Sequence, residues 1–177
     1  MMESPDTIEE ERIKKLYSYE ILDTPADGTF DKITALAAKV FSVPIAIISL
    51  VDVDRIWFKS HYGVQDDEIK RDLGLCASAI LSNDIYLIDE AKSDPRCLAN
   101  PLVAGDFGLN FYVAAPLTTK DGYNLGTLCL IDKKKRNFDD KQQSILIMMA
   151  EIVMEQIEIR LLSRNLLKEY LSNRSIS

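Results

Sequence analysis

Histidine and cysteine are scarce in this chain, and their spacing excludes several kinds of site. His61 is the one histidine, and the three cysteines, Cys76, Cys97 and Cys129, lie far apart. A structural zinc site needs closely spaced Cys or His ligands, and the sequence has neither a CxxC nor an HxxxH pattern. An odd number of distant cysteines does not form a disulfide framework either, so we expect free thiols and a reducing compartment.

Long apolar runs and clustered positive charge are also missing. No run approaches the roughly 20 apolar residues of a transmembrane helix, and the acidic N-terminal segment lacks the basic and apolar regions of a secretory signal. The 28 acidic and 21 basic residues give a net charge of −7, and the single basic run at 133–136 is too short to hold a nucleic acid. We therefore expect a cytoplasmic protein that binds neither nucleic acid nor membranes.

Two apolar segments near the middle of the chain predict a β-hairpin. Residues 111–117 and 125–132 flank a polar turn that contains Asp121-Gly122. Both arms carry apolar side chains at successive positions, so both faces of the hairpin must be covered. The hairpin is therefore predicted to lie in the middle of a sheet.

A second hairpin is predicted over residues 45–62. The β-branched run 45–51 indicates a buried strand, and a turn at 52–54 separates it from a second strand with alternating polarity. Because side chains alternate between the faces of a strand, we expect two sets in the second strand. One set is Ile56, Phe58 and Ser60, and the other is Arg55, Trp57, Lys59 and His61.

Three helices and an irregular segment complete the pattern. Apolar residues spaced by three and four predict helices over about 8–21, 29–41 and 139–170. The last helix has two apolar stripes, so we expect it to contact the sheet and another helix. Residues 64–110 mix loops with a short apolar helix near 75–81 and a short strand at 85–88. Long irregular segments of this kind are usually functional or mobile.

The order of these elements, together with several motifs, resembles a GAF domain. The motifs are the segments 15–25, 30–41, 49–60 and 75–80, the AspProArg and AsnProLeuVal turns at 94–96 and 100–103, and the AlaProLeu and GlyThrLeuCysLeuIleAsp segments of the central hairpin. They are similar to bacterial GAF domains found with histidine kinases, diguanylate cyclases and response regulators. The resemblance implies an α+β fold, in which a six-stranded antiparallel sheet carries the N- and C-terminal helices on one face and the cover of a ligand pocket on the other. We assign 1–14 to the N-terminal tail and helix start, 15–165 to the GAF domain, and 166–177 to the end of the last helix and a tail.

The resemblance implies a sensory or regulatory module of a two-component or cyclic-dinucleotide system. We expect an unidentified small molecule to bind between the sheet and the 64–110 cover and to shift the terminal helices. Those helices would also join a homodimer and act on a kinase or cyclase output domain, and the sequence leaves open whether such a domain follows Ser177. The site would combine apolar enclosure with Arg55 and Arg96 as anchors for an anionic group. The candidate ligand-binding residues are Arg55, Trp57, His61, Leu75, Cys76, Ile80, Arg96, Phe107, Phe111 and Val113.

The cofactor and the enzyme alternatives depend on short motifs. Phytochrome-like GAF domains attach a bilin to a Cys that is commonly followed by His, but Ala77 follows Cys76. For a cyclic nucleotide, Asn83 with Asp89-Glu90 matches only a fragment of the phosphodiesterase GAF signature. Residues 74–79 are similar to a segment of free methionine-(R)-sulfoxide reductases, although the chain departs from that family near 57–60. We predict that the chain is not an enzyme, with a ligand-free dimerisation module and a thiol-dependent reductase as the alternatives.

Overall fold

The six strands form one antiparallel sheet in the order β3-β2-β1-β6-β5-β4 in a computed structural model that describes residues 5–174. The two predicted hairpins pair with each other through β1 and β6, so β6 lies at the centre and is buried along its whole length. The central position and the antiparallel pairing are confirmed. The strands are β1 (Ile45–Val51), β2 (Arg55–Tyr62), β3 (Glu68–Lys70), β4 (Tyr86–Ile88), β5 (Phe111–Thr118) and β6 (Asn124–Asp132).

Three long helices occur where the apolar spacing predicted them, although the first ends at Ser18 and not near residue 21. They are α1 (Pro5–Ser18), α2 (Gly28–Val40) and α5 (Asp140–Arg174). Residues 1–4 and 175–177, which include parts of the predicted tails, lie outside the described range. The start of α5 is fixed by a reciprocal cap, because Asp139 Oδ1 accepts from the Gln142 N–H at 2.8 Å and Gln142 Oε1 accepts from the Asp139 N–H at 3.0 Å. Within residues 5–174 no helix combines the length and the apolar character needed to cross a bilayer.

The cover contains more regular structure than the sequence indicated. Besides β4 it holds the 3-10 helix η1 (Arg71–Leu73) and two short helices, α3 (Cys76–Ala79) and α4 (Pro101–Ala104). Strand β3, η1 and α4 were not predicted, because elements of three or four residues are too short to show a hydrophobic period. Strand β3 forms only because it pairs with the beginning of β2.

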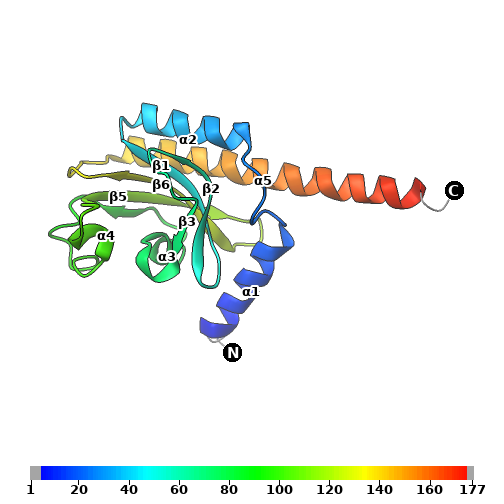
Figure 1. Ribbon diagram of the computed structural model, residues 1–177, viewed down its shortest axis with the longest axis horizontal. Helices are drawn as coiled ribbons and strands as arrows, with labels where there is room; N and C mark the ends of the chain where they lie inside the picture. The colour runs from blue at the N-terminus through cyan, green and yellow to red at the C-terminus, as the bar shows by residue number, and fades with distance from the viewer. Residues whose placement is uncertain (1–4, 175–177) are drawn as a thin grey trace.

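The sheet is buried on both faces. Figure 1 shows α2 and α5 on one side of the strands and α3 and α4 on the other. On the helix side, Leu16 of α1, Phe30 of α2 and Leu146 of α5 belong to one core cluster. On the cover side, Ile80 and Leu109 pack with the strand residues. The layered α+β fold that the resemblance implied is therefore confirmed.

A bulge in β2 changes which side chains face the helices. Ile48 pairs with Ser60 but Ser49 pairs with Phe58, so Lys59 is an extra residue in β2. Ser60 therefore faces α2, where its Oγ lies 2.9 Å from Thr34 Oγ1. The predicted alternation was wrong for Ser60 and for the residue after it, because one inserted residue shifts the faces of all that follow.

Candidate functional site

The cover begins after β2 and packs directly on the strands below it. Leu75, Cys76 and Ile80, at and beside α3, are each at most 6% exposed. They share one cluster with Tyr112 of β5 and other residues of the central strands, and Phe107 is partly buried against the same cluster. Four of the predicted ligand-binding residues, Leu75, Cys76, Ile80 and Phe107, thus lie together on the side of the cover that packs on the sheet.

A polar cluster lies inside this apolar layer. Tyr112 Oη donates a hydrogen bond to Cys76 Sγ at 3.1 Å, and Ser49 Oγ lies 3.0 Å from Thr127 Oγ1. Hydrogen bonding, first from Cys129 and then from the nearby hydroxyl groups, outweighs burial and lowers the pKa of Cys76. The contact with Cys76, together with burial, raises the pKa of Cys129 well above its ordinary value. The cluster satisfies polar groups that the cover buries, and it holds α3 against the sheet.

The third thiol is also enclosed. Cys97 is 2% exposed, and its Sγ donates to the Ala91 carbonyl at 3.4 Å and lies 3.6 Å from the Asp94 carbonyl. Burial raises the pKa of Cys97, and a protonated thiol is a poor nucleophile. All three cysteines are buried, and this arrangement gives no support to the reductase alternative.

Three of the predicted ligand-binding residues lie on the opposite face of the sheet. Trp57, Phe111 and Val113 belong to the core cluster on the helix side. The neighbours Tyr112 and Ala114 face the cover instead, because side chains alternate along β5. The sequence could not assign these faces, since every residue in the arm is apolar. A single pocket lined by all ten candidates is therefore wrong.

His61 lies near the outer end of β2, on the side of Phe58. The two rings are 6.4 Å apart between centroids in an edge-to-face arrangement. His61 Nε2 lies 3.1 Å from Asp67 Oδ1, so a partner for its imidazole comes from the loop before β3. Trp57 and His61 both line an open depression of about 610 Å³ at this edge of the sheet, although they lie on different faces of β2.

Arg96, a predicted anchor for an anion, is already paired. Its guanidinium donates to both carboxylate oxygens of Asp94, and its Nη2 donates to the Leu87 carbonyl at 2.9 Å. The same group lies 5.2 Å from the centre of the Tyr86 ring. Hydrogen bonding to Asp94 raises the pKa of Arg96. Arg96 thus links the long loop of the cover to β4.

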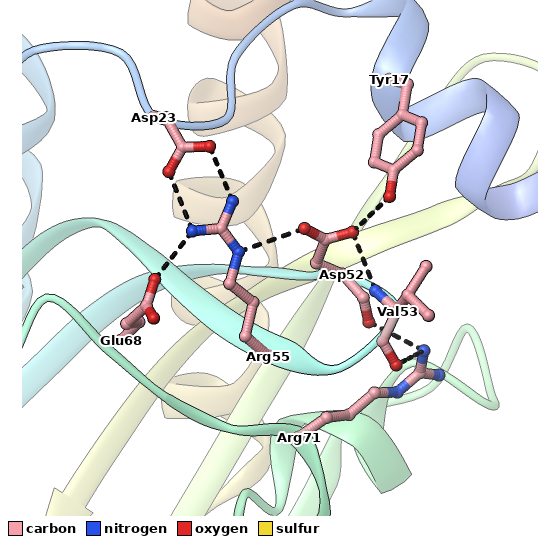
Figure 2. Close-up of polar contacts among 7 residues, drawn as sticks. All are labelled: Tyr17, Asp23, Asp52, Val53, Arg55, Glu68 and Arg71. Atoms are coloured by element: carbon pink, nitrogen blue, oxygen red, sulfur yellow. Dashed lines mark hydrogen bonds and ion pairs between the residues drawn. The ribbon is translucent and has the colours of Figure 1, made fainter.

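Arg55, the other predicted anchor, joins three carboxylates. Figure 2 shows its guanidinium between Asp23 of the α1–α2 loop, Asp52 of the β1–β2 turn and Glu68 of β3. Its Nη1 and Nη2 donate to Asp23 at 2.9 and 2.7 Å, Nη1 also donates to Glu68 at 2.8 Å, and Nε donates to Asp52 at 3.2 Å. These bonds, led by those to Asp23, raise the pKa of Arg55. Arg55 therefore joins the α1–α2 loop, the β1–β2 turn and β3 by ion pairs, and this group of four residues is called the Arg55 network.

Asp52 is the buried member of this network. Burial opposes its ionisation, but hydrogen bonds from Tyr17 Oη at 2.8 Å, from the Val53 N–H and from Arg55 outweigh burial and lower the pKa of Asp52. Tyr17 belongs to α1, so this helix is tied to the β1–β2 turn (Figure 2). Asp52 and Arg55 are three residues apart in a turn, which is a local signal for an ion pair. Nothing local in the sequence links Asp23 or Glu68 to Arg55.

Arg71 completes the connection between the cover and α1. Its Nη1 donates to the Asp52 carbonyl at 2.8 Å and to Glu9 Oε1 of α1 at 2.7 Å. Glu9 also accepts two bonds from Arg12, and these bonds, with Arg71 in support, lower the pKa of Glu9 to about 2 against burial. The beginning of the cover is thus joined to the first helix by ion pairs, and a displacement of η1 would act directly on α1.

Comparison with known proteins identifies the class to which this architecture belongs. The profile of the GAF domain family matches residues 25–159, and the chain belongs to the GAF family. It is 36% identical over 159 residues to a cyclic di-GMP phosphodiesterase of Pseudomonas aeruginosa, and this match covers 88% of the chain. The match covers 27% of the phosphodiesterase, so the chain spans about a quarter of the length of this relative.

Solved structures show the same fold at low sequence identity. The GAF domain of an Acinetobacter phosphoenolpyruvate-protein phosphotransferase is similar with a TM-score of 0.64 and 16% identity, over 93% of this chain and 99% of that one. A type II free methionine-R-sulfoxide reductase of Thermoplasma acidophilum is similar with a TM-score of 0.61 and 18% identity, over 73% of this chain and 90% of that one. Because one fold hosts many functions, these likenesses establish the architecture alone.

Proposed function

We propose that this chain is a regulatory GAF module of a cyclic-dinucleotide signalling protein. The observation that carries the proposal is the 36% identity to a cyclic di-GMP phosphodiesterase, in which the matching region is about a quarter of the relative. The buried thiols favour regulation over catalysis, because the chain offers no accessible cysteine nucleophile within its described residues.

The proposed signal begins under the cover and ends at the terminal helices. A small molecule that displaces Leu75 and Ile80 from the sheet would also move η1, which directly precedes them in the chain. Arg71 would pass this movement to Glu9 of α1, and Arg55 would pass it to the α1–α2 loop through Asp23. A ligand can shift such an equilibrium only by binding one arrangement better than the other. The ion pairs provide the contacts by which the two arrangements would differ.

Native mass spectrometry of the freshly purified chain tests the ligand. We expect a mass above that of the denatured chain by one small molecule, and a lower thermal midpoint once that molecule is removed. Ala79→Leu adds bulk beneath α3, where Ala79 is 1% exposed, and should reduce the occupancy. Ser78→Leu introduces the same side chain on the exposed side of α3 and is the matched control. A wild-type chain that carries no molecule and gains no thermal stability from any tested metabolite would refute ligand binding.

A ligand-free dimerisation module is the second candidate, and the surface of α5 favours it. Figure 1 shows α5 extending well beyond the sheet. Val153, Met154 and Ile157 of this helix are buried, but seven apolar side chains from residue 152 onward are between 48% and 60% exposed: Ile152, Ile159, Leu162, Leu166, Leu167, Tyr170 and Leu171. Apolar residues at such spacing on one helix favour pairing with a second helix.

Light scattering tests this pairing. We expect a dimer that Leu162→Asp converts to a monomer, because the new carboxylate would be buried between two helices. Asn165→Asp places the same charge one turn away at a polar position and should leave the dimer intact. A wild-type chain that is a monomer at every concentration would exclude the dimerisation module and would also weaken the route through the terminal helices.

A further inference from the structure

Lys59, the extra residue of the β2 bulge, is a buried lysine without a carboxylate partner. It is 5% exposed, and its Nζ donates to Thr24 Oγ1 and to the Pro25 carbonyl at 2.8 Å each. None of the ion pairs formed among residues 5–174 includes Lys59. The aromatic rings of Phe30 and Trp57 lie 5.4 and 5.8 Å from Nζ. An ammonium group has three donors, so one donor is left without an acceptor, and the charge faces these two rings and the carboxylates of Asp27 and Asp31, neither of which forms an ion pair with it.

Arg164, a residue with a second unmatched donor, lines the same depression. This depression has a volume of about 390 Å³ and lies between the α1–α2 loop and α5. Arg164 lines it together with Lys59, and the Arg164 Nε atom is buried without a hydrogen-bond partner. The nearest carboxylate, that of Glu20, is 4.0 Å from this Nε and is bound by Lys168 at 2.7 Å. The buried Lys59 and the half-buried Arg164 thus each have one donor without an acceptor.

The charges around the depression do not balance. Lys59, Arg160 and Arg164 line it with one carboxylate, Asp27, whereas the whole chain has a net charge of −7. Asp27 binds Arg160 at 2.6 Å and also accepts from the Thr29 N–H at the start of α2, so its charge is already shared. A buried charge is costly unless it is paired. Asp31 acts on Lys59 from outside the lining, and Glu20 is shared between Arg164 and Lys168, so the lining itself keeps an excess of positive charge that indicates an anion.

We propose that this depression binds a phosphate group, held by Lys59 Nζ, Arg164 Nε and the guanidinium of Arg160. A phosphate oxyanion accepts several charge-assisted hydrogen bonds at once, and lysine and arginine are its usual partners. The site lies where α5 leaves the sheet beside the α1–α2 connection (Figure 1). It is on the helix side of the sheet, away from the cover, and phosphate binding does not depend on the proposed function.

Trp57 provides the measurement. It is the single tryptophan of the chain, and its ring is 5.8 Å from the Lys59 ammonium. Pairing that ammonium with an anion should change the Trp57 emission, so inorganic phosphate can be titrated into the full chain with excitation at the red edge of tryptophan absorption. Sodium chloride at the same ionic strength corrects for screening. We expect a saturable change with phosphate and none with chloride.

Three variants decide whether the response comes from this site. Lys59→Met keeps the aliphatic stem, and Arg164→Gln keeps a polar side chain. Each should weaken phosphate binding at least about tenfold, the usual effect of losing one hydrogen bond to a charged group. Lys39→Met removes an exposed lysine of α2 and should bind as the wild type does. If circular dichroism shows that Lys59→Met is unfolded, Arg164→Gln decides alone, since its side chain is 31% exposed and is not part of the core.

Two outcomes would overturn the proposal. One is a wild-type titration in which phosphate acts no differently from chloride, and the other is phosphate binding that survives in Arg164→Gln with unchanged affinity. Glycerol 2-phosphate distinguishes the source of the phosphate group. Saturable binding of this ester assigns the site to phosphate esters, and binding of inorganic phosphate alone assigns it to the free anion.

Discussion

Replacing Arg55 by methionine should destabilise the protein and loosen the cover from α1. Methionine keeps an unbranched stem of similar length but removes the guanidinium that joins Asp23, Asp52 and Glu68. The three carboxylates would then face one another without the cation between them. The perturbation therefore tests whether this ion-pair network, shown in Figure 2, stabilises the junction.

The expected magnitude follows from the exposure of each partner. The side chain of Asp52 is 10% exposed, so the loss of its bond to Arg55 should cost on the order of 2 kcal/mol, as for other hydrogen bonds to buried charges. Asp23 and Glu68 have side chains that are 64% and 51% exposed, and such pairs contribute about 0 to 1 kcal/mol each. The free energy of unfolding should fall by about 2 to 4 kcal/mol, with Asp52 responsible for about half of the loss or more.

Urea unfolding at neutral pH measures this loss, and Glu68→Gln is the control. The control removes only an exposed partner and should cost less than about 1 kcal/mol. Because the pKa of Asp52 is lowered in the folded state, its stabilising effect is present above the ordinary carboxyl value of 3.8 and is lost as the pH falls through the folded value. The difference between wild type and Arg55→Met should therefore shrink below pH 3.8.

Hydrogen exchange adds a spatial test of the same variant. We expect faster exchange in α1 and β3, the elements that the network joins, and unchanged exchange in β6. A loss below about 0.5 kcal/mol, or a cost for Glu68→Gln equal to that for Arg55→Met, would refute the reasoning, because either result would place the energy outside Asp52.

Two further predictions concern other parts of the fold. Glu9→Gln should remove a contribution to stability that depends on acid pH. The pKa of Glu9 is lowered from 4.5 to about 2, so its stabilising effect is lost as the pH falls from 4.5 to about 2. Over this range the free energy of unfolding should fall by on the order of 1 kcal/mol more in the wild type than in the variant, after allowance for the partial exposure of Glu9. Urea unfolding at several acidic pH values checks this, and parallel curves would contradict it. Gly126→Ala should lower the free energy of unfolding by about 3 kcal/mol or more, because the new Cβ would lie 1.8 Å from the Ser49 carbonyl oxygen. Gly28→Ala is the control: its Cβ would have nothing within 4 Å, so the free energy of unfolding should change by less than about 1 kcal/mol. Thermal unfolding measures both.

The sequence was sufficient for the architecture but not for the orientation of the site residues. Both hairpins, the three long helices and the GAF resemblance follow from periodicity, turn residues and motifs that are read along the chain. The placement of Phe111 and Val113 did not follow, because an arm that is apolar on both faces carries no signal for which face meets the helices. The bulge at Lys59 was also invisible, since it depends on the register with β1.

The sequence by itself determined both hairpins and the three long helices, because neighbouring residues specify them, and its motifs carried the resemblance to a GAF domain. Only the tertiary structure decided which charges meet. Arg55 binds Asp23 across 32 positions of the chain, and Arg160 binds Asp27 across 133. Ion pairs require that two side chains come within a few ångströms of each other, and the folded packing of α1, β2, β3 and α5 sets these distances. The Arg55 network and the buried Lys59, which has no carboxylate in an ion pair with it, both result from that packing.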